Sequence, residues 1–166
     1  MAGRSASTLK LLYDNAGLQS QLRPHGEPLA PSGPRVIGLT KEFMRILGLL
    51  PVVLGRGEYV VGASGASLIR TLLIQLMIED VAVADRGGAL HLRGLLPDDR
   101  LDALAALPPI QATRESVLAA HLACARLFLP LARELCMQTG IAWPEQLHRA
   151  LSDHLLRHLS LDIDSG

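Results

Sequence analysis

The chain of 166 residues carries sixteen basic and sixteen acidic residues, and its sequence pI is near 7.0. This balance lacks the dense positive charge with which dedicated DNA- and RNA-binding proteins neutralise phosphates, so we expect no nucleic-acid partner. Apolar residues make up 49% of the chain but aromatic residues only 3%. That composition argues against base-stacking platforms and favours packed helices over β-sandwiches, and the length suits one compact domain.

The N-terminus has no apolar core of a secretory signal. The most lipid-like stretch, residues 68–84, is interrupted by charged residues, and the apolar run at 46–54 is short and contains Pro51. A spanning helix needs about 20 residues with almost no charge. We therefore predict a soluble, cytoplasmic protein with no membrane partner. Cys124 and Cys136 are predicted to be reduced core cysteines, because on one helix they lie about 18 Å apart, too far for a disulfide.

Residues 1–34 are predicted to form an extended arm and a Pro-rich linker. Residues 7–12 have the pattern of a short strand or an extended piece. Residues 24–34 contain four prolines and two glycines, which are incompatible with regular structure. The remaining residues, 35–166, are predicted to form the helical bundle domain.

Apolar residues spaced by three and four positions predict a first helix over residues 35–54, which Pro51 either kinks or ends early. Glu58 opens a second helix that runs to about residue 79 or 84. Small residues over positions 62–66 indicate either close packing of another helix or a loss of local stability. They do not indicate a phosphate-binding loop, because no strand precedes them and no Lys-Ser/Thr ending follows.

A short helix is predicted to start at Pro97 and to stop before the two prolines at 108–109. Thr113 is the predicted N-cap of a long helix that contains Pro130 and stops at Gly140. A last helix runs from residues 143–145 to about 159. The predicted fold class is therefore all-α: a helical bundle of four main helices plus a short one, with a short extended N-terminal arm.

Two patterns suggest chemistry on the last helix. His154 and His158 share one helical face, as a zinc pair requires, but no Glu completes a His-Glu-x-x-His motif, and we predict no metal site. Arg149 and His154, separated by four residues, resemble the ribonuclease motif of HEPN domains. The resemblance implies that this Arg and His handle the 2′-hydroxyl and the scissile phosphate of RNA, although Ala150 replaces the usual polar residue after the Arg.

Carboxylates on the first two predicted helices are Glu42, Glu58 and Glu79. Any of them could act as a general base toward a hydroxyl if a phosphate donor were bound nearby. Carboxylates in such positions are more often ordinary surface charges, and we expect this for most of them.

Three segments, taken in order, resemble the second half of bacterial nucleotidyltransferases of the aminoglycoside adenylyltransferase type. Residues 9–22 (LKLLYDNAGLQSQL) resemble the last strand of the family's catalytic domain. Residues 40–76, which include Lys-Glu-Phe at 41–43 and Gly-Arg-Gly-Glu-Tyr at 55–59, resemble the start of its helical domain. Residues 127–144, which close on Gly-Ile-Ala-Trp-Pro, resemble the end of that domain.

The family's chemistry needs a Gly-Ser loop for the triphosphate and an Asp-x-Asp pair that holds magnesium. This chain has neither in that arrangement, and its Asp-Ile-Asp lies at residues 162–164. The resemblance therefore implies a substrate-binding or dimerisation domain that is not catalytic on its own. The resemblance implies no cofactor for this chain itself, and magnesium and ATP would be bound only if a catalytic half were supplied. The implied partner is a second copy of the chain or that separate catalytic half.

By position, the resemblance nominates Glu42 and Glu58 as candidate catalytic carboxylates. It nominates Arg56, Glu58 and Tyr59 as substrate-binding residues. Two alternatives stay open: a helical-bundle interaction protein, and a HEPN-type ribonuclease that uses Arg149 and His154.

Overall fold

The computed structural model describes residues 28–83 and 91–163, and this part of the chain is helical with no strand. The helices are α1 (Gly33–Leu47), α2 (Leu50–Arg56), α3 (Tyr59–Glu79), α4 (Leu92–Leu95), α5 (Asp98–Ala105), α6 (Arg114–Gln138) and α7 (Glu145–Leu159). The predicted all-α class is confirmed, with α1, α3, α6 and α7 as the main helices. Residues 1–27 of the predicted arm and linker, including the segment at 9–22, lie outside the described residues. The linker prediction is wrong at its end, because α1 already begins at Gly33, and Pro34 lies in its first turn, where proline is tolerated.

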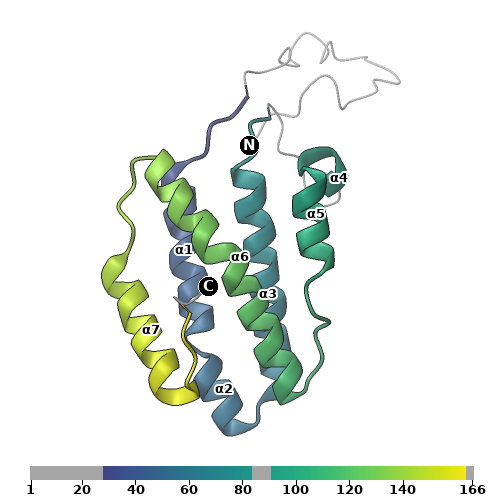
Figure 1. The fold of residues 1–166 in the computed structure, drawn as a ribbon, viewed down its shortest axis with the longest axis vertical. Helices are drawn as coiled ribbons and strands as arrows, with labels where there is room; N and C mark the ends of the chain where they lie inside the picture. Colours follow the sequence, from purple (N-terminus) through teal and green to yellow (C-terminus); the bar gives the residue numbers. More distant parts are fainter. Residues whose placement is uncertain (1–27, 84–90, 164–166) are drawn as a thin grey trace, which may run out of the picture.

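Helices α3 and α6 lie side by side in the middle of the bundle, and α1 packs against both of them (Figure 1). Helix α7 lies on the α1 side, where it contacts α1 and α2. Helices α4 and α5 lie on the opposite side, beside α3 (Figure 1). The bundle thus has α6 at its centre and α7 attached mainly through other helices.

Helix boundaries follow the sequence signals closely. Of the two outcomes predicted for Pro51, the structure shows an early end: the first helix stops at Leu47, and Pro51 lies in the first turn of α2, where its missing N–H costs nothing. Thr113 caps α6, because its hydroxyl oxygen accepts a hydrogen bond from the Ser116 N–H at 3.3 Å. Gly140 follows α6 with a φ of +68°, a conformation that favours glycine.

The core is built from aliphatic side chains around a single aromatic pair. Phe43 of α1 and Phe128 of α6 are the only two phenylalanines of the chain, and their rings stack with centroids 3.8 Å apart. Both are fully buried. They fix α6 against α1 at mid-height of the bundle.

Cys124 and Cys136 are both buried and free on α6, which confirms the prediction of reduced core cysteines. Burial raises the pKa of both thiols, and Arg70 partly opposes this effect at Cys124. Neither sulfur is therefore poised as a nucleophile, because the reactive form of cysteine is the thiolate.

Glu79 is buried, so the expectation of a surface charge is wrong for this residue. Only 1% of it is exposed, at the last position of α3. Its carboxylate accepts a hydrogen bond from the Ser32 N–H at 2.7 Å and pairs with the Arg35 guanidinium at 3.0 Å. Because Ser32 is the N-cap of α1, this carboxylate ties the end of α3 to the start of α1.

The small residues of α3 allow α6 to approach closely, as one of the two interpretations of this stretch predicted. A Cβ placed on Gly62 would lie 2.8 Å from Val117 Cγ1 of α6 and 2.9 Å from Val53 Cγ1 of α2. Ala66, one turn further along α3, is fully buried. There is no room at Gly62 for even one methyl group.

We predict that Gly62→Ala lowers the free energy of unfolding by about 1 kcal/mol, because overpacking of two stiff valines outweighs the gain in helix propensity. The matched control is Gly38→Ala in α1, where an added Cβ meets nothing within 4 Å. That change is expected to stabilise the protein by about 0.5–1 kcal/mol. Urea denaturation of both variants measures the difference, and equal effects of the same sign would contradict the packing account.

His121 is buried in the contact between α6 and α3. Its Nδ1–H donates to the Val117 carbonyl at 2.7 Å, and its Nε2 lies 3.5 Å from the position of a Cβ on Gly65. Burial lowers the pKa of His121 below its usual 6.5, and the hydrogen bond to Val117 only partly opposes this. The folded protein therefore favours the neutral imidazole.

Because the unfolded chain takes up this proton first, we predict that stability is full above pH 6.5 and falls as the pH drops below that value. In His121→Leu, the part of the fall in stability below pH 6.5 that comes from protonation of His121 should disappear. The control is His91→Leu at an exposed position. Denaturation series over pH test this, and an unchanged acid slope in His121→Leu would refute it.

Candidate functional site

Glu42, the first candidate carboxylate, lies on α1 and is held by Arg45. The Arg45 guanidinium donates two hydrogen bonds of 2.7 Å, one to each carboxylate oxygen. This hydrogen bonding lowers the pKa of Glu42. A carboxylate in this state is a weaker base, so the local chemistry does not favour Glu42 as a proton acceptor.

Arg56, Glu58 and Tyr59 lie together in the turn between α2 and α3, which Gly57 allows with a φ of +69°. Arg56 and Glu58 are exposed, and Tyr59 is half-buried. The second half of α1 and the whole of α2 separate Glu58 from Glu42. The nominated substrate-binding residues are thus neighbours in one turn, as their sequence positions require, and the two candidate carboxylates lie on different elements.

Arg149 and His154 both lie on α7 but point in different directions. Positions five residues apart are about 140° apart around a helix axis. Arg149 is paired with Glu145 at 3.8 Å, whereas the His154 ring lies against that of His158, with centroids 4.7 Å apart. His154 lines a shallow groove between α1 and α7 with Arg45 and Arg157, so within one chain the structure does not bring Arg149 and His154 together.

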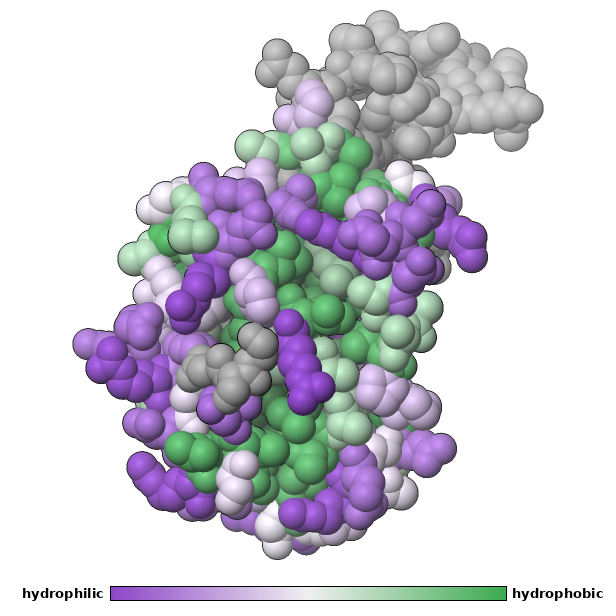
Figure 2. Space-filling view, viewed as in Figure 1, coloured by the Kyte–Doolittle hydropathy of each residue, from purple (hydrophilic) through white to green (hydrophobic). Residues whose placement is uncertain are grey.

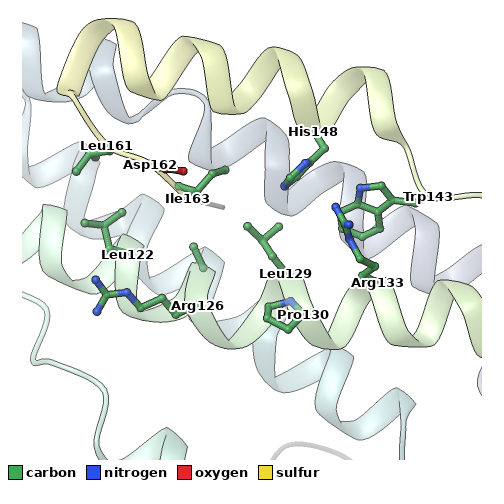
Figure 3. Close-up of a pocket in the computed structure, with 11 residues that line it drawn as sticks. Leu122, Arg126, Leu129, Pro130, Arg133, Trp143, His148, Leu161, Asp162 and Ile163 are labelled. Atoms are coloured by element: carbon green, nitrogen blue, oxygen red, sulfur yellow. The ribbon is translucent and has the colours of Figure 1, made fainter. Parts of the chain in front are cut away.

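A pocket of about 600 Å³ lies between α6 and α7, and none of the residues that line it was nominated as a site residue from the sequence (Figure 3). Residues of α6 form one wall, α7 and the segment before it form another, and the segment after α7 folds back over one end. The lining residues are Leu122, Ala125, Arg126, Leu129, Pro130, Arg133, Trp143, His148, Leu161, Asp162 and Ile163. The walls are thus mostly apolar, with polar groups at a few places.

Polar groups gather at the Trp143 end of the pocket. The Arg133 guanidinium lies over the Trp143 ring, 5.0 Å from its centroid, a cation–π geometry that holds the side chain in place. The buried His148 ring meets the same indole edge-on, at 5.4 Å between centroids. The indole Nε1 of Trp143 is buried and has no hydrogen-bond partner.

Pro130 leaves a backbone carbonyl of α6 without its usual hydrogen-bond donor. Proline has no amide N–H, so it leaves the carbonyl of the residue four positions earlier, Arg126, without its usual donor. Arg126 and Pro130 both line the pocket. Arg126 and Arg133 form no ion pair among the residues that the structure describes, which leaves two guanidinium groups at the pocket.

A sequence signal for this wall does exist. Leu122, Arg126, Leu129 and Arg133 follow one another at spacings of four, three and four residues, which places them on one face of a helix. The facing residues, Trp143, His148 and those at 161–163, are distant in sequence and carry no such signal.

No group of three or more potential metal ligands is placed to hold an ion in residues 28–83 and 91–163. Stretches of α3 and α6 are long and apolar enough to cross a membrane by length and composition, which the core helix of a bundle also satisfies. Comparison of the chain with protein-family models, curated proteins and solved structures finds no match.

Proposed function

We propose that the chain is a helical domain that binds a small molecule, as the substrate-binding domain of a nucleotidyltransferase-like protein, and is not catalytic on its own. The observation that carries the proposal is the pocket between α6 and α7. Its volume of about 600 Å³ is in the range of small-molecule sites, which are lined by apolar side chains with a few convergent polar groups.

The position of the pocket is consistent with the resemblance to the helical domain of nucleotidyltransferases. Arg133 and Trp143, which form one end of it, lie in residues 127–144, the last of the resembling segments. Asp162 is the one acidic residue among those that line the pocket. A single carboxylate does not make the paired magnesium site of phosphoryl transfer, so in this proposal magnesium and ATP belong to a separate catalytic half.

Trp143 supplies a direct test, because it is the only tryptophan of the chain and lines the pocket. We predict that a small apolar molecule changes the fluorescence of Trp143 and raises the melting temperature. Ala125→Phe, which fills the pocket from its α6 wall, should abolish both effects. The control is Ala119→Phe, at an exposed position of the same helix, and binding that survives Ala125→Phe would contradict the proposal.

A second candidate function, self-association, is favoured by one face of α3. Val60, Val61 and Leu68 are 72%, 57% and 55% exposed on this helix. Three hydroxyl side chains nearby donate to carbonyls of their own helix at 3.0–3.2 Å, which lowers the polarity of the same face: Ser64, Ser67 and Thr71. Arg70, the one charge between Glu58 and Glu79, instead donates to the Pro108 carbonyl, so an uncharged helix face is left for a second copy.

We predict that Leu68→Glu converts a dimer into a monomer, because it places a charge in the middle of this uncharged face. Leu156→Glu on α7 is a matched control, since Leu156 is 56% exposed. Light scattering coupled to size-exclusion chromatography measures the mass. A monomeric parent protein, or equal masses for both variants, would count against self-association through α3.

A further inference from the structure

We infer that the pocket between α6 and α7 takes a small monocarboxylate with an apolar body, its carboxylate bound at Trp143 and Arg133. This inference rests on the proposed ligand-binding function and adds the chemical class of the ligand and its orientation. It follows from the donors at one end of the pocket, the distribution of charge, and the apolar wall between the two ends.

The donors at the Trp143 end call for a group that only accepts hydrogen bonds. The indole Nε1–H is buried without a partner, and Figure 3 shows this nitrogen on the side of the ring nearer to His148. An indole N–H and a guanidinium are donors with no acceptor capacity, and an ionised carboxylate is their complement. This nitrogen has almost no surface open to solvent, so a small turn of the indole is needed to bring it to a bound acceptor. That acceptor then satisfies a donor that is otherwise left unpaired.

Charge along the pocket sets the orientation. Arg126 and Arg133 oppose the single carboxylate of Asp162, so arginine outnumbers acid in the lining. Asp162 lies with Leu161 and Ile163 at the end away from Trp143 (Figure 3). Arg126 lies at the same end of the pocket as Asp162 and offsets its charge (Figure 3). The positive charge that no lining carboxylate offsets is therefore that of Arg133, and it attracts an anionic group to the Trp143 end, whereas a cationic ligand meets both guanidinium groups unfavourably.

The apolar wall fits the rest of such a ligand. Leu129 and Ala125 of α6 lie between the two ends, and Leu122, Leu161 and Ile163 surround the far end. Figure 2 shows apolar surface along the middle of this side of the molecule, with hydrophilic residues on both sides of it. A hydrocarbon body lying along Leu129 would remove this surface from water, while its charge stays near the arginine.

The test uses three ligands of the same length that differ in head-group charge: octanoate, octanamide and octylammonium. Isothermal titration calorimetry on the full chain should show octanoate binding about tenfold more tightly than octanamide, with octylammonium the weakest. Arg133→Gln should weaken octanoate about tenfold and leave octanamide unchanged. Trp143→Phe, which keeps a ring but removes the N–H, should also weaken octanoate.

Arg149→Gln is the control, since it removes an equal charge from an exposed site on α7 outside the pocket, and it should leave octanoate binding unchanged. Equal affinity for octanoate and octanamide, or tightest binding of octylammonium, would overturn the inference while ligand binding itself stands. Loss of octanoate affinity in Arg149→Gln equal to that in Arg133→Gln would also overturn it. Absence of binding for all three ligands would overturn both the inference and the proposed function.

Discussion

The close contact of α6 with α3 at Gly62 is the constraint on which the bundle depends. With a Cβ position only 2.8 Å from Val117, α6 is drawn to the α3 side, and the stacked pair of Phe43 and Phe128 holds it against α1 as well. Helix α7 is attached to α1 and α2 instead. It therefore cannot close onto α6, and the space left between them is the pocket.

This arrangement explains why the outer face of α6 tolerates residues that a packed face would not. The guanidinium groups of Arg126 and Arg133 lie at the pocket between α6 and α7. Pro130, which also lines the pocket, interrupts the hydrogen bonding of α6 on the same side. The indole of Trp143 fills one end of the space but leaves its N–H without an acceptor. Buried polar groups are costly unless they find hydrogen-bond partners, and these groups are the basis of the proposal that the gap binds a ligand.

Local signals predicted most of the fold, because caps, prolines and glycines act within one turn of helix. Thr113, Gly140 and Pro51 each set a boundary that was expected, and the small residues around Gly62 indicated a close helix contact. Glu79 was missed because its burial depends on Ser32 and Arg35, which lie more than forty residues earlier. The pocket was missed for the same reason: the stripe on α6 was visible, but its opposite wall is set by the path of α7. The roles assigned to Glu42, Glu58, Arg149 and His154 stay predictions.

Ligand binding at Trp143 is measured most directly by following its single indole N–H in a proton–nitrogen correlation spectrum of the full chain. One tryptophan gives one indole resonance, and it reports on the Nε1–H of Trp143, which is buried without a hydrogen-bond partner. We predict that octanoate moves this resonance to higher proton frequency as the hydrogen bond to the carboxylate forms. An indole resonance that stays in place at saturating octanoate would contradict it.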